Sequence, residues 1–433
     1  MLFKLFSCIG LLHCSLHSQA LYTSPQNADS ADVLAYHITL EPEIYDQHIK
    51  GNVRIEFLLD RNASLIIFNS GNLRIDSVTG KSVKGYENKD NKLRITLSKR
   101  SADRNTVHIY YQGHPQRGVV FQPESEQVYT VFHTSQWMPC HESPEDKAKI
   151  RMDLFVPSHL KCIASGSLTD KKTADGKSMY SWIQDYESPA YTYGFAIGNF
   201  TEFTQEVNGA TLRYYSQHYA REEMEIIFSK TAEILHFFEK KSGVPYAQNT
   251  YSQVLAGDHY QEMTGFAMLK NSYGEAVLKD STETGLISHE LAHQWWGNNI
   301  TCKNWNHFWL NEGFATYFSA AYNEHRFGKE KYNAEIQSCA SVYERIKENG
   351  NDKPLVFPDW TSPTPDDRSL VYFKGAYVLH LLRQKLGDEM FWNGIRAYSR
   401  EYFGRSVTTA DFQGSMERAT GQDLRDFFNA WIY

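Results

Sequence analysis

The segment "HELAHQWW" (residues 289–296) places two imidazoles and one carboxylate within five positions. His289 and His293 are four residues apart, and on an α-helix this spacing puts both rings on one face, where they can reach the same ion. Glu290 lies between them, which completes the H-E-x-x-H pattern of two Zn²⁺-binding histidines and a general-base glutamate. Because a packed helix can carry the same letters by chance, a third ligand is the deciding feature.

Glu312 is the candidate for that third ligand. Eighteen residues separate it from His293, and the connecting segment "GNNITCKNWNHFW" is long enough to reverse the chain and bring the next helix alongside. A catalytic zinc has three protein ligands and an open fourth position for water, so this set favours hydrolysis over a structural metal. His307 could compete as a ligand, but its place in the connecting loop is more typical of an exposed or hydrogen-bonded histidine.

Helices must position these residues, and the second half of the chain predicts them. The stretch 221–243 places its apolar residues on one stripe at helical spacing, opens with acidic residues and closes on two lysines and a glycine. It is followed by one predicted strand, "YSQVLAG", and by a loop. Further helices are predicted over 313–328, 329–349, 375–387, 388–404 and 409–421.

The first half of the chain has the pattern of β-strands instead. From about residue 34 to residue 201, apolar and polar residues alternate in short runs separated by turn clusters. One face of the first two strands holds Tyr36, Ile38 and Leu40, and Val53, Ile55 and Phe57. The sequence therefore predicts an α+β chain, with an all-β domain over residues 21–205 and a mostly α domain over residues 206–433.

The N-terminal residues 1–20 have the pattern of a secretory signal peptide. Lys4 precedes an apolar run, and Ser18 and Ala20 stand at the small-residue positions of a cleavage site. No later stretch reaches the roughly 18 apolar residues of a membrane-spanning helix. We therefore expect a periplasmic or secreted protein without a membrane span; a lipid anchor through Cys14 is the alternative.

The net charge of the chain argues against nucleic-acid binding, and the spacing of its cysteines argues against a cysteine metal site or a disulfide-rich fold. A formal net charge of −7 and a pI near 6.2, without a stripe of Lys and Arg, argue against a nucleic-acid partner. The spacing of the cysteines beyond the signal segment matches neither a CxxC metal site nor a dense disulfide framework, and we expect no bridge. These cysteines are Cys140, Cys162, Cys302 and Cys339.

The segment "HELAHQWWGNNITCKNWNHFWLNEGFATYF" resembles the zinc signature of the M1 (gluzincin) aminopeptidases, the group that includes aminopeptidase N. The likeness continues in "YHITLEPEIYDQHIKGNVRIEF", in "MPCHESPEDKAKIRMDLFVP" and in "SLVYFKGAYVLHLLRQKLG". It implies an N-terminal β saddle or sandwich followed by a thermolysin-like catalytic domain. It stops near the end of that domain, so we expect a short form without the family's C-terminal helical domain and with a more open cleft.

The resemblance implies a role for each residue of the signature. One Zn²⁺ per chain would be held by His289, His293 and Glu312. Glu290 would take a proton from the attacking water and pass it to the leaving amine. Tyr372, in "VYFKG", matches the tyrosine that donates a hydrogen bond to the tetrahedral oxyanion.

The amine-binding motif of the family is altered in this chain. An aminopeptidase needs an anion that pairs with the free α-ammonium, and the family places it in a G-x-M-E-N motif. Here "GDHYQEMTGFAML" aligns Glu262 with that glutamate and Gly265 with the glycine three residues later, while Gln261 and Met263 replace the usual Met and Asn. Gln136, in "HTSQWMPC", resembles the glutamine that helps to hold the same amine.

Two further positions depart from the family pattern. Ser319 stands where many members have an acidic residue, and Phe373 replaces the glutamate of the usual Tyr-Glu-Lys-Gly. We expect altered support of the ligands rather than lost activity. The predicted function is a zinc aminopeptidase acting on peptides with a free N-terminus. A zinc endopeptidase of the same fold and a non-catalytic binding scaffold remain the alternatives.

Overall fold

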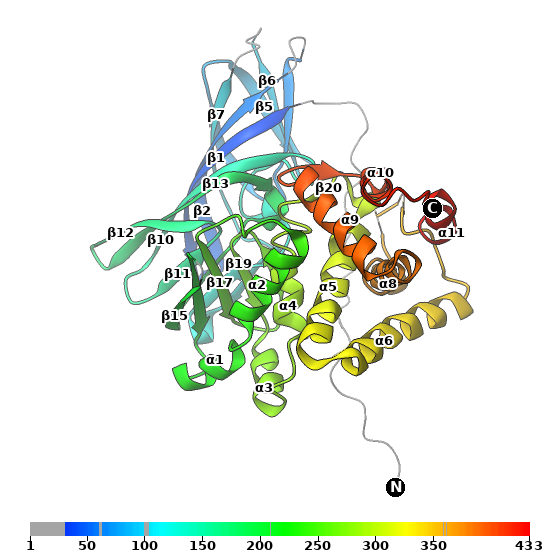
Figure 1. Ribbon diagram of the computed structural model, residues 1–433. Helices are drawn as coiled ribbons and strands as arrows, with labels where there is room; N and C mark the ends of the chain where they lie inside the picture. The colour runs from blue at the N-terminus through cyan, green and yellow to red at the C-terminus, as the bar shows by residue number, and fades with distance from the viewer. Residues whose placement is uncertain (1–30, 60–62, 99–103, 208, 358, 361) are drawn as a thin grey trace. The chain divides into compact units, whose positions relative to one another are not determined.

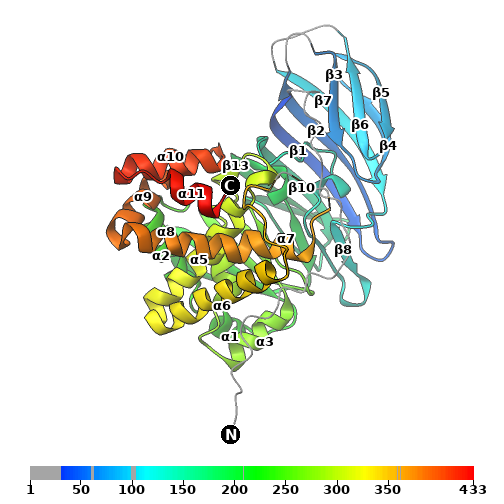
Figure 2. The same cartoon turned by 90° about the vertical axis from the view of Figure 1, so that its right-hand side faces the viewer.

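The computed structural model describes residues 31–59, 63–98, 104–207, 209–357, 359–360 and 362–433, so the expected signal segment lies outside the described residues. The chain forms two compact units (Figures 1 and 2). Pro25–Arg221 and Ala247–Leu269 belong to the β-rich unit, and Glu222–Tyr246 and Lys270–Tyr433 belong to the helical unit. This order of a β-rich part and a helical part confirms the predicted α+β class.

A seven-stranded sheet dominates the β-rich unit, with the strand order β12-β13-β10-β1-β2-β7-β4. β1 and β10 pair in parallel, and the other pairs are antiparallel. The predicted alternation is confirmed, because Ile38 pairs with Val53 and both are fully buried. The strands are β1 (Asp32–Glu43), β2 (His48–Leu58), β4 (Arg74–Thr79), β7 (Asn105–Gly113), β10 (Lys147–Pro157), β12 (Ser167–Ala174) and β13 (Lys177–Pro189).

Two smaller sheets pack with it around one continuous apolar core. The first has the order β3-β6-β5, and the second has the order β11-β14-β9-β8. Short 3₁₀ turns connect some of these strands. The elements are β3 (Leu65–Asn69), β5 (Val83–Lys89), β6 (Lys92–Leu97), β8 (Val119–Gln122), β9 (Gln127–Thr130), β11 (Lys161–Ala164), β14 (Phe195–Gly198), η1 (Pro123–Ser125), η2 (Thr134–Gln136) and η3 (Ala190–Thr192).

A five-stranded sheet with the order β15-β16-β17-β19-β18 completes the β-rich unit (Figure 1). Its strands are β15 (Thr201–Val207), β16 (Ala210–Ser216), β17 (Thr250–Leu255), β18 (Gln261–Met263) and β19 (Phe266–Leu269). The loop that we expected after β17 is instead the β18–β19 hairpin. Both strands are buried at every position, so they show no alternation that a sequence pattern could reveal. Residues 206–221 and 247–269, expected in the second domain, thus group with the β-rich unit.

The helical unit contains the helices predicted for the second half of the chain. α5, α6 and α8 lie side by side in it (Figure 2). Among its described residues no helix is both long and apolar enough to cross a membrane. Its elements are α2 (Thr231–Ser242), α3 (Asn271–Lys279), α4 (Gly285–Ala292), β20 (Thr301–Cys302), η4 (Trp305–His307), α5 (Trp309–Phe327), α6 (Lys329–Glu348), α7 (Pro365–Ser369), η5 (Leu370–Lys374), α8 (Gly375–Leu386), α9 (Asp388–Glu401), β21 (Ser406–Val407), α10 (Thr409–Thr420) and α11 (Arg425–Trp431).

The single helix predicted over 221–243 is wrong in one respect, because the structure breaks it in two. α1 (Arg221–Ile227) ends before a turn in which the amide of Thr231 donates to the carbonyl of Phe228, three residues back. α2 then begins at Thr231 and ends as predicted, at the left-handed Gly243. Because the apolar stripe continues across the turn, the spacing of apolar residues did not reveal the break.

Candidate metal centre

α4 presents both histidines of the HELAH segment on one face. The helix ends at Ala292, but His293 keeps helical backbone angles (φ −58°, ψ −22°), and its amide donates to the carbonyl of His289 at 3.3 Å. The spacing of four residues therefore has the helical geometry that the sequence predicted.

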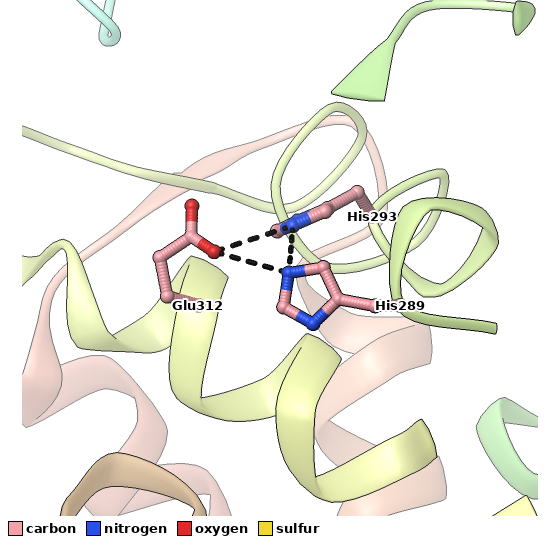
Figure 3. Close-up of side chains that lie close together, drawn as sticks. All are labelled: His289, His293 and Glu312. Atoms are coloured by element: carbon pink, nitrogen blue, oxygen red, sulfur yellow. Dashed lines mark hydrogen bonds and ion pairs between the residues drawn. The ribbon is translucent and has the colours of Figure 1, made fainter. Parts of the chain in front are cut away.

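The three predicted ligands converge on one point, as Figure 3 shows. The Nε2 atoms of His289 and His293 are 3.1 Å apart. Oε2 of Glu312, in the first turn of α5, lies 3.3 Å from the first nitrogen and 3.4 Å from the second. His293 and Glu312 are almost fully buried, whereas His289 keeps 17% of its side-chain surface exposed. Two imidazole nitrogens and one carboxylate oxygen are the donor set of a hydrolytic zinc site.

The ring of His293 is fixed by a main-chain carbonyl. Its Nδ1 lies 3.0 Å from the carbonyl oxygen of Trp296. Because a carbonyl only accepts hydrogen bonds, Nδ1 carries the proton and Nε2 has a free lone pair toward His289 and Glu312. Gly297 allows this approach, since a Cβ there would lie 2.8 Å from the same Nδ1 and its φ is +137°.

The protonation states of the ligands suit a divalent cation. Burial lowers the pKa of His289 and so favours its neutral ring. The hydrogen bond and charge of Glu312 raise the same pKa, but it remains below its usual value. Burial on its own would raise the pKa of Glu312, but when the rings of His293 and His289 are protonated, their charges and hydrogen bonds lower it below its usual value. Neutral imidazoles and an ionised carboxylate are the forms that bind metal.

Two further predicted residues lie beside the ligands. Glu290 is buried, and one of its carboxylate oxygens is within 4.8 Å of a ring nitrogen of His293. Tyr372 lies in η5, a π-helical turn between α7 and α8, and its ring is parallel to that of His289 with 5.8 Å between centroids. π-turns within α-helices are frequent at functional sites. The structure thus places a buried carboxylate beside His293 and the ring of a tyrosine beside His289.

Contacts between α4, α5 and α8 hold the ligands in place. The hydroxyls of Ser288 and Ser319 are 2.6 Å apart, which ties the residue before His289 to α5. Gly313 and Gly375 allow α5 and α8 to cross closely, because a Cβ on either would lie 2.9 Å from the other's Cα. These residues position Glu312 and Tyr372 without touching the point of convergence themselves.

His307 is not part of this cluster. Its Nδ1 lies 3.0 Å from the hydroxyl of Thr409 in α10 and also accepts from the amide of the same residue at 3.3 Å. Burial lowers its pKa. As the sequence favoured, His307 is a hydrogen-bonded histidine of the connecting segment.

The candidate amine-binding residues lie in the β-rich unit. Glu262 is at the centre of β18 and is 5% exposed, so it is a buried strand residue and not a surface glutamate of a loop. Gly265 forms the turn to β19 at φ +83°. Gln136 ends η2 and is buried with its carboxamide against Gly71, where a Cβ would lie 2.5 Å from Nε2.

Sequence reasoning missed four residues that shape these sites. The carbonyl of Trp296, the glycines Gly313 and Gly375, and the carboxamide of Gln261 had no role in the prediction. The glycines stand next to Glu312 and near Tyr372, and this closeness could have drawn attention to them. No pattern in the sequence indicates that Gln261 reaches residues far away along the chain.

Comparisons with known proteins identify related chains. The model of the peptidase family M1 domain matches residues 226–431, and that of the peptidase M1 N-terminal domain matches residues 33–192. A probable aminopeptidase 2 of Sulfurisphaera tokodaii is 24% identical over 428 residues, which cover 92% of this chain and 53% of that protein. Leucine aminopeptidase 2 of Aspergillus oryzae is 27% identical over 322 residues, which cover 70% of this chain and 51% of that protein. The chain spans about half the length of these relatives.

Solved structures show the same fold over almost the whole chain. A variant of the M1 zinc metallopeptidase of Deinococcus radiodurans, bound to a Tyr-Ser-Ala substrate, matches with a TM-score of 0.78 and 23% identity, covering 93% of this chain and 94% of that one. A two-domain M1 zinc metallopeptidase variant bound to L-tryptophan matches with a TM-score of 0.80 and 22% identity, covering 96% of each chain.

Proposed function

Because the chain belongs to peptidase family M1, we propose that it is a zinc-dependent aminopeptidase that holds one Zn²⁺ and removes the first residue from peptides. One observation carries the proposal: the two histidines of α4 and the glutamate of α5 place three donor atoms 3.1 to 3.4 Å from one another in a buried site. The relatives named aminopeptidases add support.

The residues at this point fit a zinc ion. With Nδ1 of His293 donating to the Trp296 carbonyl, its lone pair at Nε2 faces a second imidazole nitrogen and a buried carboxylate. Such a set of buried acceptors is costly unless a cation or a proton lies between them. We propose that His289, His293 and Glu312 hold the metal, which in a three-ligand site supplies a Lewis acid and a water nucleophile at neutral pH.

Glu290 and Tyr372 supply the proton transfer and the oxyanion contact in this proposal. Glu290 takes a proton from the attacking water and delivers it to the nitrogen of the leaving peptide. Its burial on α4, one residue beyond His289, holds the carboxylate at the ligands. Tyr372 donates its phenol hydrogen to the carbonyl oxygen as that oxygen becomes negative, and the parallel packing of its ring against His289 holds the phenol in place.

Glu262 gives the enzyme its preference for a free N-terminus. A carboxylate that pairs with the α-ammonium of a peptide leaves only the first peptide bond at the nucleophile. We propose that Gln136 accepts a further hydrogen bond from this ammonium and that the turn at Gly265 keeps the strand of Glu262 in place. The burial of Glu262 within β18 supports this role, because a carboxylate attracts an ammonium more strongly where little water screens the pair.

A panel of aminoacyl-fluorophore amides, assayed with and without a chelator, tests the function. We expect chelation to abolish turnover and Zn²⁺ to restore it. Glu290→Gln should lower kcat about a hundredfold to ten-thousandfold without changing zinc content. Glu330→Gln, at an exposed position in the first turn of α6, is the matched control and should behave as wild type. A protein without bound zinc, or an unchanged kcat in Glu290→Gln, refutes the proposal.

The same assay separates an exopeptidase from an endopeptidase of the same fold. Acetylating the N-terminus of a test peptide removes the charge that Glu262 would bind. We expect cleavage of the acetylated peptide to be lost and cleavage of the free peptide to be retained. Internal cleavage of both peptides would instead establish the endopeptidase, and binding without turnover would establish a non-catalytic scaffold.

We also propose that the protein acts in the periplasm or is secreted. The support is the pattern of residues 1–20, with its cation, apolar run and small-residue cleavage positions. N-terminal sequencing of the mature protein from fractionated cells should then begin near residue 21. Recovery of the intact N-terminus in the cytoplasmic fraction would contradict this location, and a lipid on Cys14 would establish an anchor instead.

A further inference from the structure

The strand that carries Glu262 has sheet support on one side only. β18 is three residues long, forms the edge of its sheet, and pairs with β19 alone, with Glu262 opposite Ala267. The ladder of an edge strand leaves its outer main-chain groups without a neighbouring strand. Other contacts must therefore fix the direction in which Glu262 points.

The carboxamide of Gln261 makes two such contacts. Its Oε1 accepts from the amide of Phe132 at 2.5 Å, and its Nε2 donates to the carbonyl of Tyr191 at 3.0 Å. The side chain is 1% exposed, and each end faces a partner of the opposite kind, so the amide has one orientation. Two hydrogen bonds to main-chain atoms, one of them fully buried, make this a rigid connection between three segments.

Thr264 provides a second anchor on the other side of Glu262. Its amide donates to the carbonyl of Thr192 at 2.9 Å, and its hydroxyl donates to the hydroxyl of the same residue at 2.6 Å. The chain is thus anchored on both sides of Glu262. Gln261, one residue before it, bonds to Tyr191, and Thr264, two residues after it, bonds to the next residue, Thr192.

The contact to Phe132 reaches a segment with an unusual backbone. Phe132 and His133 both have left-handed angles, with φ of 49° and 39°. Left-handed angles are unfavourable for a residue with a Cβ atom, so the surroundings must hold both residues there. The same turn continues directly into η2, where the amide of Gln136 donates to the carbonyl of His133 at 3.0 Å. Gln261 therefore connects the strand of Glu262 to the segment of Gln136.

We propose that Gln261 is a positioning residue, which holds the strand of Glu262 against the Val131–Gln136 segment so that Glu262 and Gln136 meet the same substrate ammonium. Successive side chains of a strand point to opposite faces, so Gln261 acts through the main chain that it holds and not by touching the substrate. This inference rests on the proposed function. One of the two residues that depart from the motif that the resemblance implies thus supports its glutamate.

The test is the substitution Gln261→Met, which keeps the length of the side chain and removes both hydrogen bonds. We expect KM for aminoacyl-fluorophore amides to rise about tenfold or more while kcat changes less than about threefold, because the ammonium contact is made equally before and during reaction. Zinc content should be unchanged. Gln184→Met removes another buried carboxamide of the β-rich unit and is the matched control, with an unchanged KM expected.

The double variant with Glu262→Gln shows whether Gln261 acts through Glu262. If it does, the second substitution should add little to the rise in KM, since the two changes remove one interaction. Additive effects, or a loss of kcat without a change in KM, would overturn the inference. Thermal unfolding of every variant identifies any that do not fold. If Gln261→Met does not fold, the variant Gln261→Glu takes its place. It keeps the acceptor for the Phe132 amide and loses the donor to Tyr191, and it must raise KM at least about threefold.

Failure of this inference is distinguishable from failure of the proposed function. If Glu262→Gln alone leaves KM unchanged, the amine-binding role of Glu262 is wrong. If Glu262→Gln raises KM and Gln261→Met does not, the role of Glu262 stands and only the positioning role of Gln261 is refuted.

Discussion

The crossing of α5 and α8 at Gly313 and Gly375 makes a prediction that separates packing from chemistry. Ordinary van der Waals contacts of a Cβ lie at 3.4 to 4 Å, whereas a Cβ on Gly375 would lie 2.9 Å from the Cα of Gly313. Its nearest neighbour is main chain, which cannot rotate away as a side chain can. Gly375→Ala therefore requires the two helices to move apart by about 0.5 to 1 Å.

Two opposing effects set the size of the change in stability. Alanine in a helix interior gains about 0.5 to 1 kcal/mol over glycine. Overpacking a filled core costs about 1 to 3 kcal/mol, and a contact between two main chains belongs at the upper end. We expect a net loss of about 1 to 2 kcal/mol. The displacement also moves Glu312, which precedes Gly313, and Tyr372, three residues before Gly375, so kcat should fall up to about a hundredfold.

Thermal unfolding followed by tryptophan fluorescence measures this loss, since most of the tryptophans lie in the helical unit. Gly414→Ala is the matched control, because a Cβ there meets only the flexible end of Arg418, at 3.1 Å. The control should raise the melting temperature, whereas Gly375→Ala should lower it together with kcat. If Gly375→Ala is as stable and active as wild type, the close crossing does not position the site.

Three further predictions concern pH, metal and the helix contact. Burial raises the pKa of Glu335 from 4.5 to about 7. Its stabilising contribution is therefore present below pH 4.5 and is lost as the pH rises through 7. Urea unfolding should show that the free energy of unfolding declines by about 3 kcal/mol over this range, and Glu335→Gln should remove the decline. Chelation should lower the melting temperature, because the ligands bind only in the folded state, and His293→Ala should abolish this difference. Ser319→Ala, which removes the 2.6 Å contact to Ser288, should weaken zinc binding about tenfold in a chelator competition, and an unchanged affinity would refute its supporting role.

The parts of the site that depend on local geometry could be predicted from the sequence. The four-residue spacing of His289 and His293 determines a shared helical face wherever the helix forms. The alternation around Ile38 and Val53 likewise determines which side of a strand is buried, and both residues are fully buried as expected. These predictions needed only neighbours within a few residues along the chain.

The parts that depend on distant partners could not be predicted. The turn at Phe228 interrupts an apolar stripe that reads as continuous, and β18 and β19 are too short and too buried to alternate. Gln261 has a role only because its carboxamide meets the main chain of residues 129 and 70 positions away. A single sequence has no periodic pattern that predicts such a contact. A side chain that bonds to main-chain atoms can have almost any residue type as its partner, so the partner's type gives no signal.

Two departures from the family pattern have a common physical character in the structure. Where the resemblance to the M1 aminopeptidases implies an acidic residue, Ser319 has a hydroxyl that bonds to Ser288; where it implies a methionine, Gln261 has a carboxamide that bonds to two main-chain groups. In both cases a neutral hydrogen bond joins the segment of a functional residue to a neighbouring element. Neutral pairs are screened little by salt and do not titrate. The position of His289 should therefore depend less on ionic strength than it would with a charged residue at position 319.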